Sequence, residues 1–296
     1  MARAMVNEDQ ITKELHNIIA WMTALGLPAR NSRYARYEEH INKFYRPGLD
    51  LLSKKGRQFL KELTEAYREC IDIYLVYKCF QHVRHPNFIS KLSKVVSGND
   101  VPDLEVAGAS RNFLFELLVA ARFHLAGYAI DFDDTSDVVA KRDGLVVRAE
   151  CKRLASEKQL KKRINKAADQ LAAAMTEVKE EVVGIVCLDV SSCVLSGLSQ
   201  VVETVDDADK EIRAALRRFL VRNANLIETL NRKHIDVSYA TCLIGTLPIW
   251  SRDFVLHASA STEVRAAETL CDKKYERLKR VLAGFDETFT KVFYSM

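Results

Sequence analysis

The N-terminal third of the chain has the hydrophobic spacing of amphipathic helices. Apolar residues recur every three or four positions from Ile11 to Met22, and a longer helix is expected from Gly56 to His82. A Tyr- and Arg-rich connection, 30–37, joins the two. Residues 97–102 combine Ser-Gly-Asn-Asp with a proline, which indicates a boundary. We therefore expect a helical N-terminal region, 1–100, followed by a second domain, 101–296.

After this boundary the pattern changes to alternating helices and strands. One helix precedes three short strands, and a second helix opens at Ser156, where Gln159 completes the spacing of a capping box. The expected elements are helix 107–126, strands 128–132, 137–141 and 145–151, a helix from 156, strand 182–190, helix 206–230, strand 237–247 and a closing helix from 262. This order predicts an α/β (α+β) fold with an αβββαβ core, in which helices flank a mixed sheet of four or more strands.

Composition indicates a globular protein of the cytoplasm. The chain has 296 residues, an apolar fraction of 48% and seven cysteines without Cys-x-x-Cys spacing, which fits a reducing compartment. The N-terminus reaches acidic residues before any long apolar run, and the apolar stretch 18–27 is too short to cross a bilayer. We expect neither a signal peptide nor contact with a membrane.

Basic residues are concentrated around the third predicted strand and the helix after it. The net charge of +4 is modest, but residues 141–166 hold ten basic residues against three acidic ones. This local excess either follows a phosphate backbone or forms a solvated helix face. The rings and cations of 30–37 likewise either contact nucleic acid by stacking and charge or pack as a polar connection.

A predicted hairpin places two carboxylates opposite each other. Asp143-Gly144 is a strong signal for a two-residue turn, and a turn there pairs Asp137 directly with Glu150. Strand alternation puts Lys152 on the same face as Glu150. Like charges opposite each other on a ladder repel, and a divalent cation between them would reverse the sign of that interaction. The hairpin is therefore a candidate metal site.

This arrangement suits hydrolysis of a phosphodiester. Mg²⁺ or Mn²⁺ held by Asp137 and Glu150 would polarise the phosphate and lower the pKa of a bound water. Lys152 would orient or deprotonate the attacking water and offset the charge of the transition state. Glu116, the sole acidic residue of its apolar helix, could reach the same metal. The alternative for Glu116 is an ordinary pairing with a polar or basic side chain.

The helix after the hairpin offers candidates for contact with the substrate. Arg163, Lys166 and Gln170 lie along one side of it at spacings of three and four. They either line a substrate groove or form a solvated flank. Arg153, directly after the Glu-x-Lys tripeptide, is the fourth candidate for substrate binding.

Residues 107–190 resemble the PD-(D/E)xK nucleases, which share the restriction-endonuclease-like fold. The resemblance rests on Glu116, Asp137, Glu150, Lys152 and Gln170, together with the order of the elements that carry them. Ser136 stands where a proline often precedes the aspartate, and further aspartates lie at 131, 133 and 134, but the register argument prefers Asp137. The resemblance implies dependence on Mg²⁺ and cleavage of DNA or, less often, RNA.

We therefore expect a metal-dependent endonuclease that acts on DNA. Its helical N-terminal region would recognise the substrate, a partner protein or a second subunit of a homodimer. Compact nucleases of this kind serve in restriction, phage defence or repair. Two alternatives stay open: a non-catalytic nucleic-acid-binding or scaffold protein that retains the fold, and an RNA nuclease, since Glu-x-Lys chemistry does not depend on the sugar.

Overall fold

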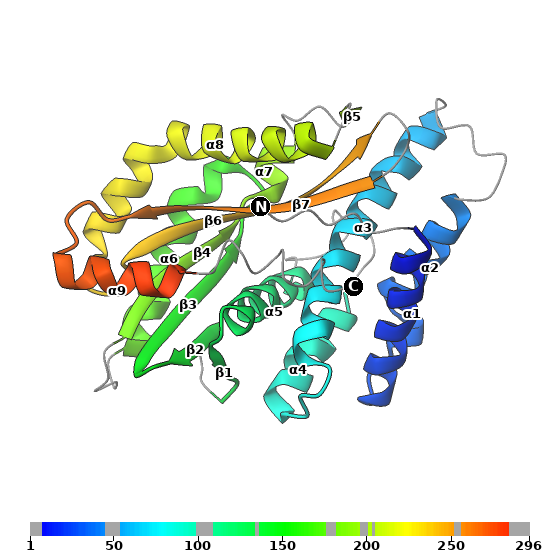
Figure 1. Ribbon diagram of the computed structural model, residues 1–296, viewed down its shortest axis with the longest axis horizontal. Helices are drawn as coiled ribbons and strands as arrows, with labels where there is room; N and C mark the ends of the chain where they lie inside the picture. The colour runs from blue at the N-terminus through cyan, green and yellow to red at the C-terminus, as the bar shows by residue number, and fades with distance from the viewer. Residues whose placement is uncertain are drawn as a thin grey trace.

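A mixed seven-stranded sheet lies between two layers of helices (Figure 1). The computed structural model describes residues 8–44, 54–98, 109–133, 136–175, 182–195, 201–202, 205–251 and 256–283. Within these ranges, no helix is long and apolar enough to cross a membrane.

The N-terminal region is helical, as the hydrophobic spacing predicts. Its elements are α1 (Glu8–Ala24), the short 3-10 helix η1 (Ala29–Asn31), α2 (Arg33–Phe44), α3 (Lys54–Phe80) and α4 (Pro86–Val96). Pro86 occupies the first turn of α4, where its missing N–H costs no helical hydrogen bond.

The Tyr- and Arg-rich stretch is not a polar loop. Most of it lies in α2, and Arg33, Tyr34 and Tyr37 are buried. The guanidinium of Arg33 donates from Nε to a carboxylate oxygen of Glu69 on α3 at 2.7 Å. These three side chains therefore pack inside the helical layer, whereas Arg30 is exposed, and contact of the stretch with nucleic acid stays a prediction.

The sheet and its connections have the predicted αβββαβ order. This core comprises α5 (Ala109–Leu125), β1 (Ala129–Asp131), β2 (Val138–Arg142), β3 (Leu145–Arg153), α6 (Leu160–Met175) and β4 (Val182–Asp189). The strand order is β1-β2-β3-β4-β6-β5, with β7 pairing to β6. The β1, β2 and β3 strands run antiparallel to one another, whereas β4 is parallel to β3 and β6 is parallel to β4. The prediction of a mixed sheet flanked by helices is confirmed.

The rest of the chain and the start of α6 differ from the sequence prediction. After β4 the chain comprises α7 (Ser191–Leu195), β5 (Val201–Val202), α8 (Val205–Lys233), β6 (Ala240–Ser251), β7 (Leu256–Ala266) and α9 (Asp272–Leu282). The segment from Thr262, expected to begin the closing helix, belongs to β7, because Thr262 pairs with Ile244 of β6. The capping box is also absent: Ser156 precedes a 3-10 turn, η4 (Glu157–Gln159), and makes no side-chain cap.

Two hydrophobic clusters cover the two faces of the sheet. One contains Val147, Ala149 and Cys151 of β3 and continues without interruption through α5 and α3 to α1. The other contains Val186 and Leu188 of β4 and packs against α6 and α8. The helical N-terminal region thus shares one core with the sheet, and the division of the chain near residue 100 stays a prediction.

Candidate active site

The β2–β3 hairpin has the turn and register that the sequence predicts. Asp143 and Gly144 both have positive φ, 51° and 73°, as a two-residue hairpin turn of the primed type requires. Val138 pairs with Ala149 on the ladder. Asp137 lies immediately before β2, one step further along this register, and its backbone N–H approaches Glu150 Oε1 at 3.4 Å. Asp137 is therefore set opposite Glu150.

Lys152 joins the two carboxylates. Its Nζ lies 2.8 Å from Asp137 Oδ2 and 3.0 Å from Glu150 Oε2. The same Oδ2 of Asp137 accepts a hydrogen bond from the backbone N–H of Cys151 at 2.8 Å. Alternation along β3 places the neighbouring Cys151 side chain in the core beneath α5, so Glu150 and Lys152 point to the opposite side of the strand. The structure thus brings three predicted site residues into direct contact.

Burial gives these groups unusual titration behaviour. The Glu150 side chain is 2% exposed and that of Lys152 is 9% exposed. Burial and the nearby Asp137 raise the pKa of Glu150 to about 7. Burial opposes ionisation of Asp137 as well, but the Lys152 ammonium, together with hydrogen bonds from Glu150 and the Cys151 N–H, outweighs burial and lowers the pKa of Asp137. The two carboxyl groups therefore have well-separated pKa values, which is a frequent property of functional sites.

Glu116 approaches the site from α5 but is held by a different lysine. Lys91 of α4 lies with Nζ 3.0 Å from Glu116 Oε2. The same Nζ donates to the backbone carbonyl of Asp137 at 2.6 Å. Burial and the charge of Asp137 raise the pKa of Glu116. Glu116 is therefore a neighbour of Asp137 through Lys91, and these residues line a shared hollow with Ser136 at the edge of the sheet.

The predicted substrate-binding residues do not gather at one place. Arg153 donates from Nε to Asp189 at the end of β4, at 2.7 Å, and so turns away from Lys152. On α6, Arg163 is half-buried, whereas Lys166 and Gln170 are exposed. The structure places these three on the outer helix, and their contact with a substrate stays a prediction.

The other aspartates before the hairpin have their own partners. Asp131 pairs with Lys141 across the β1–β2 ladder at 2.8 Å, and Asp133 pairs with His85 at 3.2 Å. Residue 134 lies outside the described residues. This supports Asp137 as the aspartate of the site.

Sequence reasoning missed Lys91, Ser136 and Arg148. The buried Arg148 guanidinium donates to Ser136 Oγ at 2.8 Å and so ties the segment before Asp137 to β3. Lys91 lies 46 residues before Asp137, and no local pattern links the two. Strand alternation places Arg148 on the same face as Glu150, but its contact with Ser136 follows only from the fold.

The carboxylate oxygens of the site are suitable ligands for a hard divalent cation, although Lys152 and Lys91 pair with them in the structure. Asp137, Glu150 and Glu116 offer carboxylate oxygens, the ligands that Mg²⁺ and Mn²⁺ prefer. Among the described residues, no group of three or more His, Cys, Asp or Glu side chains is arranged to hold a metal ion. A metal would therefore have to displace the ammonium groups of Lys152 and Lys91 from the carboxylates. The oxygen ligands, the repulsion between the carboxylates and their burial are all consistent with a site for a divalent cation.

Comparison with known proteins adds nothing to this description. No protein-family model, no curated protein and no solved structure matches the chain. The interpretation of the site therefore rests on its own geometry.

Proposed function

We propose that the protein is a metal-dependent nuclease whose active site is the β2–β3 hairpin. The observation that carries this proposal is the contact of Asp137, Glu150 and Lys152 within one buried cluster. Two carboxylates and an amine at this spacing are a costly arrangement for a merely structural strand pair, because three charged groups are withdrawn from water. Phosphodiester hydrolysis gives each of them a role.

The carboxylates would hold the metal, and Lys152 would interact with the phosphate or with the attacking water. Asp137, Glu150 and Glu116 would be the ligands for Mg²⁺ or Mn²⁺, which when bound would polarise the phosphodiester and activate water. The Lys152 ammonium would donate to a phosphate oxygen or orient the attacking water. The Cys151 N–H keeps Asp137 in position throughout.

DNA is the substrate we favour, and RNA is the alternative. The exposed Lys158, Lys161, Lys162 and Lys166 lie on η4 and α6, directly after the strand that carries Glu150. Such a face would contact phosphates without reading the base sequence. The choice of DNA, a cytoplasmic location and a role in restriction, phage defence or repair rest on the resemblance to PD-(D/E)xK nucleases. A homodimer or a partner protein bound through α1–α4 would fit the same proposal.

The test is cleavage of plasmid, linear and single-stranded DNA, and of RNA, with Mg²⁺ or Mn²⁺ and with EDTA. Glu150→Gln keeps the shape of the side chain but removes the charge, and we expect a loss of about 100-fold or more in rate. Glu276→Gln on α9 is the matched control, since Glu276 is 65% exposed and pairs with the nearby Lys279. Equal cleavage by wild type and Glu150→Gln would refute the proposal.

A non-catalytic nucleic-acid-binding protein is the second candidate. It is favoured because lysines form ion pairs with the carboxylates that a metal would need. Calorimetric titration with Mn²⁺ separates the two. The nuclease predicts metal binding that Asp137→Asn weakens, even when a missing partner or effector leaves the protein inactive. The binding protein predicts no such metal binding, and a salt dependence of DNA affinity that reflects basic contacts alone.

A further inference from the structure

A second hollow, which the proposed active site does not use, lies where the parallel strands end. We call it the strand-end hollow and define it by Arg68, Asp72, Arg153, Asp189, Ser191 and Thr246. It comprises about 320 Å³ of space, counted together with solvent at its mouth. Carboxyl ends of parallel strands are a frequent place for ligands in open α/β sheets.

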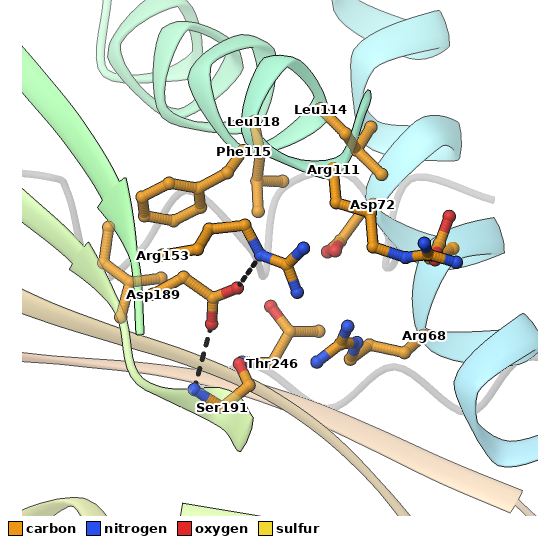
Figure 2. Close-up of a pocket in the computed structure, with 12 residues that line it drawn as sticks. Arg68, Asp72, Arg111, Leu114, Phe115, Leu118, Arg153, Asp189, Ser191 and Thr246 are labelled. Carbon is orange, nitrogen blue, oxygen red and sulfur yellow. Dashed lines mark hydrogen bonds and ion pairs between the residues drawn. The ribbon is translucent and has the colours of Figure 1, made fainter. Parts of the chain in front are cut away.

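Two guanidinium groups enter this hollow from different layers. Figure 2 shows Arg68 reaching in from α3 and Arg153 from the end of β3. The Arg68 side chain is only 5% exposed and pairs through Nη2 with Glu65 at 3.1 Å. Within the part of the chain that the structure describes, its Nε and Nη1 are buried and have no hydrogen-bond partner. Buried donors without partners cost free energy, and an anion in the hollow would meet them.

The acidic residues around the hollow are already engaged, except for one. Asp189 accepts from Arg153 at 2.7 Å and from the backbone N–H of Ser191 at 2.9 Å. Glu69 lies between Arg33 and Arg111 and is neutralised by both. This leaves Asp72 as the carboxyl group that faces the arginines.

Asp72 does not oppose an anion strongly. Burial, against the effect of Arg68, raises the pKa of Asp72 to about 7, and Asp189 and Glu69 act in the same direction as burial. Much of its population is therefore neutral at neutral pH.

We propose that the strand-end hollow is a binding site for a tetrahedral oxyanion, a phosphate group or its analogue sulfate. The forked N–H groups of arginine match the oxygens of phosphate in spacing and charge. An anion there would contact α3 and the ends of β3 and β4 together, and so join the helical N-terminal region to the strand that carries Lys152. The source is either a small phosphorylated effector or the terminal phosphate of a nucleic acid. This inference does not depend on the nuclease proposal, since none of the proposed metal ligands lies in the hollow and the binding needs no metal.

The experiment uses the full chain in EDTA and measures thermal unfolding and calorimetric binding. Sulfate is titrated against chloride at equal ionic strength. The sources are separated by a nucleoside 5′-monophosphate and by a short oligonucleotide with and without a 5′-phosphate. We expect sulfate to raise the unfolding temperature more than chloride does, and one phosphorylated ligand to bind at least about tenfold more tightly than its unphosphorylated form.

Three variants test the residues. Arg68→Gln should weaken sulfate binding at least about tenfold, because it removes the open donors and the charge. Arg84→Gln is the matched control, since Arg84 is exposed beyond the end of α3, and it should bind as wild type does. If Arg68→Gln does not fold, Asp72→Asn decides, measured well above the pKa of about 7, where wild-type Asp72 is ionised: loss of its charge should then tighten sulfate binding several-fold. Equal stabilisation of wild type by sulfate and chloride, or an unchanged affinity in Asp72→Asn, would overturn the proposal.

Discussion

Lys152 neutralises the two carboxylates of the hairpin, and Lys152→Met tests its contribution to stability. Methionine keeps the length and apolar stem of lysine but removes the ammonium that lies 2.8 Å from Asp137 and 3.0 Å from Glu150. The variant therefore leaves two buried carboxyl groups facing each other without a counter-charge.

The magnitude follows from the contacts that remain. Removing one partner of a buried ion pair costs about 3–5 kcal/mol. Asp137 keeps its hydrogen bond from the Cys151 N–H at 2.8 Å and is 17% exposed, and Glu150 can take up a proton near its pKa of about 7. We therefore expect a loss of about 2–3 kcal/mol in the free energy of unfolding, somewhat below that range.

Urea unfolding in EDTA at pH 7, where Glu150 can take up a proton, measures this loss. Adding Mn²⁺ should then stabilise Lys152→Met more than wild type, because the ion no longer competes with the ammonium. Lys158→Met is the control, since Lys158 is exposed on η4 and should change stability by less than about 0.5 kcal/mol. Equal midpoints for wild type and Lys152→Met in EDTA would refute the stabilising role. Equal stabilisation of both proteins by Mn²⁺ would refute competition between Mn²⁺ and the Lys152 ammonium.

Three further predictions concern stability. The pKa of Asp72 is raised to about 7, so this carboxyl group makes the wild type less stable as the pH rises from about 4, the pKa of an unfolded aspartate, through 7. Asp72→Asn lacks this contribution, and the difference in unfolding temperature between the two proteins should therefore grow with pH. A difference that stays constant with pH would contradict this prediction. Glu69→Gln should cost about 3–5 kcal/mol in urea unfolding, because it leaves buried arginines uncompensated, whereas Glu276→Gln should have almost no effect. Gly184→Ala should destabilise by about 3 kcal/mol or more, since its Cβ would lie 1.8 Å from the carbonyl oxygen of Val237, and unchanged thermal unfolding would show that β4 can shift.

Local signals predict the hairpin and its chemistry because both depend on short-range rules. The Asp143-Gly144 turn fixes which residues pair, and strand alternation fixes which share a face. Together these two rules are enough to place Asp137 opposite Glu150 and beside Lys152. The αβββαβ order can also be predicted from the sequence, since helical and strand periodicities differ clearly in this part of the chain.

Contacts between distant segments cannot be predicted from such local rules. Lys91 binds Glu116 and the carbonyl of Asp137 only because α4 packs beside α5, and no sequence spacing expresses that packing. The burial of Arg33 has the same origin, since its partner Glu69 lies on another helix. The strand β7 escapes prediction because its alanines and serines carry a weak apolar pattern, and its pairing with β6 decides its conformation.

The two-residue turn also determines which length changes this region can tolerate. Deleting one residue of β2 would bring Ser136 opposite Glu150, and every side chain of the strand before the deletion would exchange faces. Deleting two would restore the faces but move Asp137 along the ladder by about 7 Å, beyond the reach of Lys152. Insertions between residues 132 and 136, ahead of the ladder, leave this spacing untouched. Among relatives or engineered forms of the chain, we therefore expect length variation before Asp137 and a constant number of residues from Asp137 to Lys152.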